Sequence, residues 1–139
     1  RIVVYYFPTK DDLISEVMGA VGVRLQLTLA EAFTAAAADH VELARTAWPV
    51  LAHRDADPIF ALFFEANGLA AAGREPYRRV VTGLVDAWIE WLATFFTGEP
   101  AARRAESEAA IALLDGLLLV RQLAGPEAAD RAAARLGVA

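Results

Sequence analysis

The residues most capable of chemistry in this chain are two histidines, two serines and the carboxylates near them. The segment 53–57, His-Arg-Asp-Ala-Asp, places one imidazole and two carboxylates close together, a set that could bind a divalent metal ion. The same residues also make an ordinary polar loop in which Asp57 caps the next helix, and we favour that interpretation. Asp86 and Glu90 lie one helical turn apart, as solvated carboxylates do in most helices.

No sequence pattern typical of an enzyme is present. HExxH, GxSxG and P-loop spacings do not occur, and neither Ser15 nor Ser107 has a histidine near it in the sequence. The chain has no cysteine, which excludes a disulfide scaffold, a thiolate zinc site and a cysteine nucleophile. We therefore predict a protein that is not an enzyme and that uses no metal and no cofactor.

Bulky aromatic side chains gather on two neighbouring expected helices. Rings supply apolar area and an amide supplies both a donor and an acceptor, which together are typical of a small-molecule pocket. The same rings would also build a filled core, and the sequence leaves both interpretations open. The predicted ligand-binding residues are Trp48, Phe60, Phe63, Phe64, Asn67, Trp88 and Trp91.

Helix signals position these side chains. Thr9 is a capping residue for a helix from Lys10 to at least Ala32, and Asp39 begins a second helix that Pro49 should end or kink. Glycine stops followed by proline starts divide the rest into helices near 58–72, 76–97, 100–124 and 126–136. No segment alternates as a strand does. The sequence predicts an all-α domain of about six helices.

Length and charge limit the class of protein. The 139 residues suit one domain, and a net charge of −5 argues against a protein that coats nucleic acid with its whole surface. The uninterrupted apolar runs are too short to span a membrane, so we expect no membrane partner and a cytoplasmic protein. The chain begins at Arg1, within an apolar segment, and we expect it to be a piece of a longer protein.

The segment 111–120 is apolar almost all round its expected helix and must be covered on more than one face. A central core helix is one explanation, and a partner subunit is the other. We predict a homodimer in which the last two helices of each chain form a four-helix bundle. The predicted contact residues are Leu114, Leu117, Leu118 and Arg121.

The N-terminal run 3–13, Val-Val-Tyr-Tyr-Phe-Pro-Thr-Lys-Asp-Asp-Leu, resembles the end of the DNA-binding domain in the tetracycline-repressor (TetR) family of bacterial transcriptional regulators. Tyr6, Phe7, Lys10 and Leu13 match the family pattern, whereas Val4 stands where the family most often has tyrosine. The run Ala-Leu-Leu-Asp-Gly-Leu at 112–117 is similar to the helix with which such proteins dimerise.

The resemblance implies that residues 1–9 are the tail of a helix-turn-helix domain and that 10–139 form a TetR-like domain for ligand binding and dimerisation. Tyr5, Tyr6 and Lys10 would then contact phosphates of operator DNA. It also implies a regulator, most simply a repressor, which a small apolar or aromatic effector releases from DNA. The alternative is a helical ligand-binding or scaffold protein unrelated to DNA, and an upstream helix-turn-helix sequence would distinguish the two.

Overall fold

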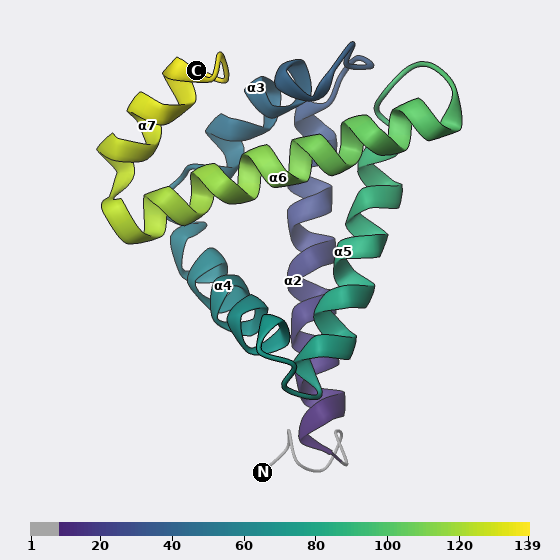
Figure 1. Cartoon of the computed structure of the whole chain (residues 1–139), viewed down its shortest axis with the longest axis vertical. Coiled ribbons are helices and arrows are strands. Elements are labelled where there is room, and N and C mark those ends of the chain that lie inside the picture. Colours follow the sequence, from purple (N-terminus) through teal and green to yellow (C-terminus); the bar gives the residue numbers. More distant parts are fainter. Residues whose placement is uncertain (1–8) are drawn as a thin grey trace.

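The computed structural model describes residues 9–139, and within them the chain is all helical. A single isolated β-bridge, between Ala37 and Phe96, is the only strand-like pairing in this part of the chain. The predicted all-α fold is therefore confirmed. The helices are α2 (Lys10–Ala32), α3 (His40–Leu51), α4 (Asp57–Ala71), α5 (Tyr77–Ala93), α6 (Pro100–Ala124) and α7 (Pro126–Arg135) (Figure 1).

Helices α2 and α3 begin where their capping residues predict, but the predicted Asp57 cap is wrong: Ala56 is the N-cap of α4, no side chain caps this helix, and Asp57 is its first residue. The Thr9 hydroxyl accepts a hydrogen bond from the Asp12 backbone N–H at 3.1 Å, and Asp39 accepts one from the Glu42 N–H at 2.9 Å. Glu106 of α6 reinforces the start of α3, because its carboxylate accepts from the His40 backbone N–H at 2.7 Å. That contact and the His40 ring, 2.8 Å away, hold the pKa of Glu106 below its usual value.

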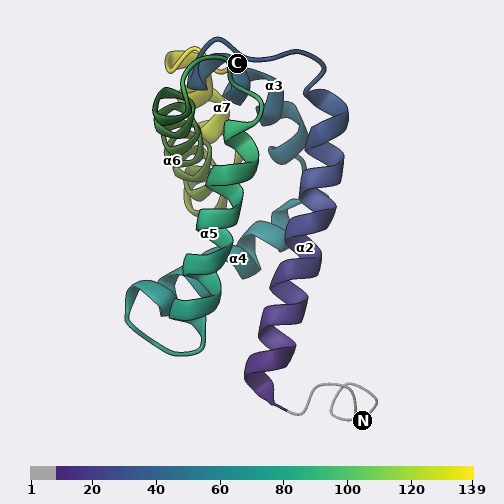
Figure 2. The same cartoon turned by 90° about the vertical axis from the view of Figure 1, so that its right-hand side faces the viewer.

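Two long helices run along the molecule and a third crosses them. In Figure 1, α2 and α5 follow the long axis while α6 lies across the end remote from the beginning of α2. Figure 2 shows α2 on one side and α6 on the other, with α5 between them. The main contacts of α2 are with α3 and α5, whereas α4 packs on α5 and α6. Near the beginning of α2, Met18 joins Ala66 of α4 and Val81 of α5 in a small buried cluster.

The largest buried cluster joins α2, through Leu29, to α3, α4, α6 and α7. Leu118 and Ala133 are fully buried at its centre, and Trp48 lies in it with 4% of its surface exposed. A second cluster, around Leu92 and Phe96, closes the end where α5 meets α6. Through these two clusters, α6 packs against other helices of its own chain along much of its length.

Two details differ from the sequence predictions. Helix α5 ends at Ala93 rather than near 97, because the chain turns so that Phe96 enters the core and the Phe95 carbonyl accepts from the Ala37 N–H at 2.8 Å. Pro49 lies inside the last turn of α3, which continues to Leu51. Helices α2 and α5 approach each other closely at Gly22, where a side chain would meet the Trp88 indole nitrogen at 3.6 Å.

Helix α2 has 23 residues and is, by length and composition alone, apolar enough to cross a membrane. It contains no long uninterrupted apolar run, because charged residues such as Arg24 occur within the helix. A helix that lines a domain core passes the same test, so this is weak evidence for a membrane span. One face of α2 does line an internal cavity, from Met18 to Leu29.

Candidate ligand-binding site

An apolar cavity of about 90 Å³, partly open to solvent, lies among five helices, α2 to α6. This volume is of the same order as the engineered apolar cavity of about 150 Å³ that binds benzene. Helix α2 contributes five of the lining residues, and α4, α5 and α6 contribute four each. The α2 residues that line the cavity are Met18, Val21, Gly22, Leu25 and Leu29.

The structure divides the predicted ligand-binding residues between this cavity and the packed core. Phe60, Phe63 and Trp88 line the cavity. Trp48 does not, because it is buried in the main core cluster. Trp91 packs edge-on against Trp88, with ring centroids 5.4 Å apart, and lies outside the lining. The aromatic set is therefore divided between a cavity and a filled core that lie side by side.

Two further predicted residues on α4 also lie outside the cavity. The Phe64 ring packs against Phe63 at a centroid distance of 5.6 Å without reaching the lining. The side-chain oxygen of Asn67 is buried and accepts no hydrogen bond from any residue that the structure describes. Asn67 is thus not the polar group of this cavity.

The polar groups of the lining are the Trp88 indole and the Asp115 carboxyl. Burial raises the pKa of Asp115 to about 6, and no hydrogen bond or neighbouring charge within the described chain offsets this effect. In the sequence, Asp115 is the one charged residue of the apolar segment 111–120. A lone carboxylate in a helix that is otherwise apolar all round is a signal that could have identified it, since burying a charge needs a compensating partner.

The predicted dimer contact face of α6 needs correction. Leu114, Leu117 and Leu118 are buried inside the chain, between α6 and the neighbouring helices, and a second copy cannot contact them without unpacking the domain. The large apolar side chains that α6 exposes are Leu119, Val120 and Leu123. They lie on the opposite side of the same helix, as the all-round apolar pattern allows.

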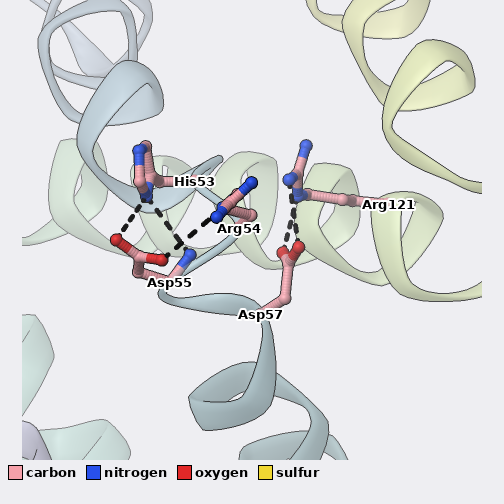
Figure 3. A network of polar contacts seen from close by, with 5 residues as sticks. All are labelled: His53, Arg54, Asp55, Asp57 and Arg121. Atoms are coloured by element: carbon pink, nitrogen blue, oxygen red, sulfur yellow. Dashed lines mark hydrogen bonds and ion pairs between the residues drawn. The ribbon is translucent and has the colours of Figure 1, made fainter.

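Arg121 also acts within the chain rather than at a partner surface (Figure 3). Its guanidinium donates two hydrogen bonds to the Asp57 carboxylate, at 2.7 and 3.1 Å, and so joins the end of α6 to the start of α4. Gln122 adds a bond from its amide to the Asp57 carbonyl at 2.9 Å. The hydrogen bonds to Asp57 raise the pKa of Arg121.

The segment 53–57 does not assemble a metal site. Figure 3 shows Asp57 turned toward Arg121, away from the contacts among His53, Arg54 and Asp55. The His53 ring accepts from the Asp55 backbone N–H at 3.2 Å, a local turn contact. Within residues 9–139, no group of three or more histidine and carboxylate side chains is placed to hold a metal ion.

Two other groups with possible chemistry have structural roles. The Ser107 hydroxyl is buried and donates to the Ile89 carbonyl at 2.6 Å, joining α6 to α5. His40 pairs with Glu106, as described above. Neither arrangement places a nucleophile beside a base.

Of the predicted phosphate contacts, Tyr5 and Tyr6 lie outside the described residues. Lys10 is exposed in the first turn of α2. The beginning of α5 lies beside it, since Arg79 approaches Asp11 at 3.7 Å. Exposed arginines and carboxylates mix at this end of the molecule, so its charge is nearly balanced. The exposed residues there are Lys10, Asp11, Asp12, Arg74, Glu75, Arg78 and Arg79.

Comparison of the chain with models of known families, with curated proteins and with solved structures finds no match. The interpretation of the site therefore rests on its own geometry and on the N-terminal motif.

Proposed function

We propose that this chain is the regulatory domain of a TetR-like transcriptional regulator, which binds a small apolar effector and thereby releases operator DNA. The observation that carries the proposal is the apolar cavity among α2 to α6, lined in part by the predicted aromatic residues. Concave, largely apolar sites with a few polar groups are the usual form of small-molecule sites. The proposal includes a cytoplasmic homodimer.

The cavity is suited to controlling DNA contacts because α2 is both a wall of the site and the continuation of the N-terminal motif. Lys10, the last basic residue of that motif, is the first residue of α2. Met18, Gly22 and Leu25 of the same helix line the cavity. An effector that binds one position of α2 more tightly than another shifts α2 toward the position that it prefers. The difference between its two binding free energies, typically about 1–3 kcal/mol, limits how far the affinity for DNA can change.

A helical ligand-binding protein unrelated to DNA shares the cavity but not the motif. The two functions differ in what the complete protein binds. The regulator requires specific binding to duplex DNA that weakens when the cavity is occupied, whereas the alternative requires no DNA binding.

The ligand-binding part is tested by titrating small aromatic compounds into the chain and following indole fluorescence. Phe63 and Phe64 provide a matched pair, since both are half-buried phenylalanines on α4 and only Phe63 lines the cavity. Phe63→Ala should weaken binding by about tenfold, because the ligand loses the contact area of one ring. Phe64→Ala should leave affinity unchanged within about twofold. Equal losses of affinity in Phe63→Ala and Phe64→Ala would show that the compound does not bind in this cavity.

The DNA part is tested on the complete protein. Lys10→Ala should weaken binding about equally across DNA sequences and reduce the salt dependence by about one counterion, as expected for a phosphate contact. A changed base preference would contradict this role for Lys10. A complete protein that binds no DNA would favour the alternative function.

A further inference from the structure

Asp115 is the one ionisable side chain among the twenty residues that line the cavity. Helices α2, α3, α4 and α5 present only apolar residues, glycine and the Trp88 indole to the same space. The neighbours of Asp115 on α6, namely Ile111, Leu114 and Leu118, are apolar as well. No charge from any wall of the cavity faces this carboxyl.

An ionised carboxylate in such a place is costly unless something pairs with it. With a pKa of about 6, roughly 90% of Asp115 is ionised at pH 7. Within residues 9–139 no lysine, arginine or histidine forms an ion pair with it. Asp115 is partly exposed at the open cavity, so solvent offsets part of this cost, and a cation that offsets the rest would come from outside the described residues.

We propose that the effector is a lipophilic cation, a protonated amine on an aromatic or alkyl body, whose ammonium group pairs with Asp115 while its body fills the cavity. This inference rests on the proposed ligand-binding function and specifies the chemical class of the ligand. A neutral molecule of the same shape would leave the carboxylate without a partner. An anionic molecule would be repelled by the carboxylate.

The Trp88 indole gives the same cavity a second feature that favours a cation. Its ring lines the cavity, and an ammonium group that contacts the face of this indole is attracted through the ring quadrupole. The rest of the lining suits the apolar body, since Phe60, Phe63 and the leucines of α2 offer only carbon surface. Charge and apolar area thus occur together in one site.

The test uses three probes of one shape: 4-phenylbutylamine, which is protonated at neutral pH, 4-phenylbutanol, which is neutral, and 4-phenylbutyrate, which is anionic. Affinities are measured at pH 7.5 by calorimetry and indole fluorescence. We expect the amine to bind about tenfold more tightly than the alcohol, because a hydrogen bond to a charged partner adds that much, and the acid to bind most weakly. Lowering the pH from 7.5 to 5 should remove most of the preference for the amine, since Asp115 then becomes protonated.

Asp115→Asn keeps the shape of the side chain and removes its charge, so it should bind the amine and the alcohol equally. The matched control is Asp86→Asn, a change of the same kind at an exposed position on α5, which should retain the tenfold preference. Equal binding of amine and alcohol by the unaltered chain, or a preference that survives Asp115→Asn, overturns the inference and leaves the proposed function standing. Failure of all three probes to bind overturns both.

Discussion

Asp115 gives the clearest test at the scale of single residues, because its ionisation opposes folding. Its pKa is raised from 3.8 to about 6 in the folded chain, so the folded state holds the proton more tightly than the unfolded state does. The free energy of unfolding that this group contributes is therefore present below pH 4 and is lost as the pH rises through 6. The loss amounts to about 3 kcal/mol at most.

Asp115→Asn should accordingly raise stability at pH 7.5 by about 2–3 kcal/mol and change it little at pH 4, where the carboxyl is protonated in both states. Urea unfolding of the two chains at several pH values measures this difference. The difference between the chains isolates Asp115 from all other carboxylates. An equal stability of the two chains at pH 7.5 would show that the carboxylate is solvated or already paired.

Asn67 supports a second prediction at this scale. Its side-chain oxygen is buried without a hydrogen-bond partner among the described residues, which costs free energy that an apolar side chain of similar volume would not. Asn67→Leu should raise the free energy of unfolding by about 1 kcal/mol in thermal or urea unfolding. Asn67→Asp should lower it at neutral pH and recover part of the loss in acid. A destabilising Asn67→Leu would mean that the amide makes a contact that compensates its burial.

At the scale of elements, the Arg121–Asp57 pair holds α6 and α4 together. Only 9% of the Arg121 side chain and 34% of the Asp57 side chain are exposed, so solvent screens this pair less than a surface ion pair. Arg121→Met should lower the free energy of unfolding by about 2 kcal/mol, largely because it leaves Asp57 without its partner. A double-mutant cycle with Asp57→Ala should give a coupling energy of about 1–2 kcal/mol.

The exposed pair Arg104–Glu108, 3.1 Å apart within α6, is the matched control. Arg104→Met should change stability by no more than about 0.5 kcal/mol, as is usual for exposed pairs one helical turn apart. Similar losses at Arg104 and Arg121 would mean that the bidentate contact adds nothing beyond a surface pair.

Helix positions could be predicted from the sequence more completely than helix faces. Capping by Thr9 and Asp39 is local chemistry, and it marks the helix starts wherever the chain goes afterwards. The end of α5 depends on a pairing between Ala37 and Phe95, which are far apart in sequence, so local signals could not place it.

The site was predictable only in part for the same reason. A helix that is apolar all round, such as α6, does not indicate which side faces its own chain. The pattern therefore predicts Leu118 at a partner surface, although this residue is 1% exposed within the chain. Similarly, the sequence identifies Phe63 and Phe64 as aromatic neighbours, and only the packing of α4 shows which of them reaches the cavity.

At the scale of the whole molecule, the large apolar side chains that remain exposed indicate where a second copy would bind. Leu123 is 80% exposed on α6, with Leu119 one turn before it on the same face. Gly116 lies one turn earlier still and has open space where a side chain would project, so a partner helix could approach the backbone closely there. Burial of such residues is the usual source of free energy for a helical dimer interface.

The dimer prediction therefore moves from the buried face of α6 to this exposed one. Sedimentation of the chain at micromolar concentration should show a dimer, and Leu123→Glu should convert it to a monomer with an unchanged helical circular dichroism spectrum. Leu118→Asp should instead unfold the chain, because it buries a charge inside the core. A parent chain that sediments as a monomer would contradict the dimer. A Leu123→Glu variant that remains dimeric would place the interface elsewhere, and the exposed α2 residues Val23 and Leu27 would then be the next surface to alter.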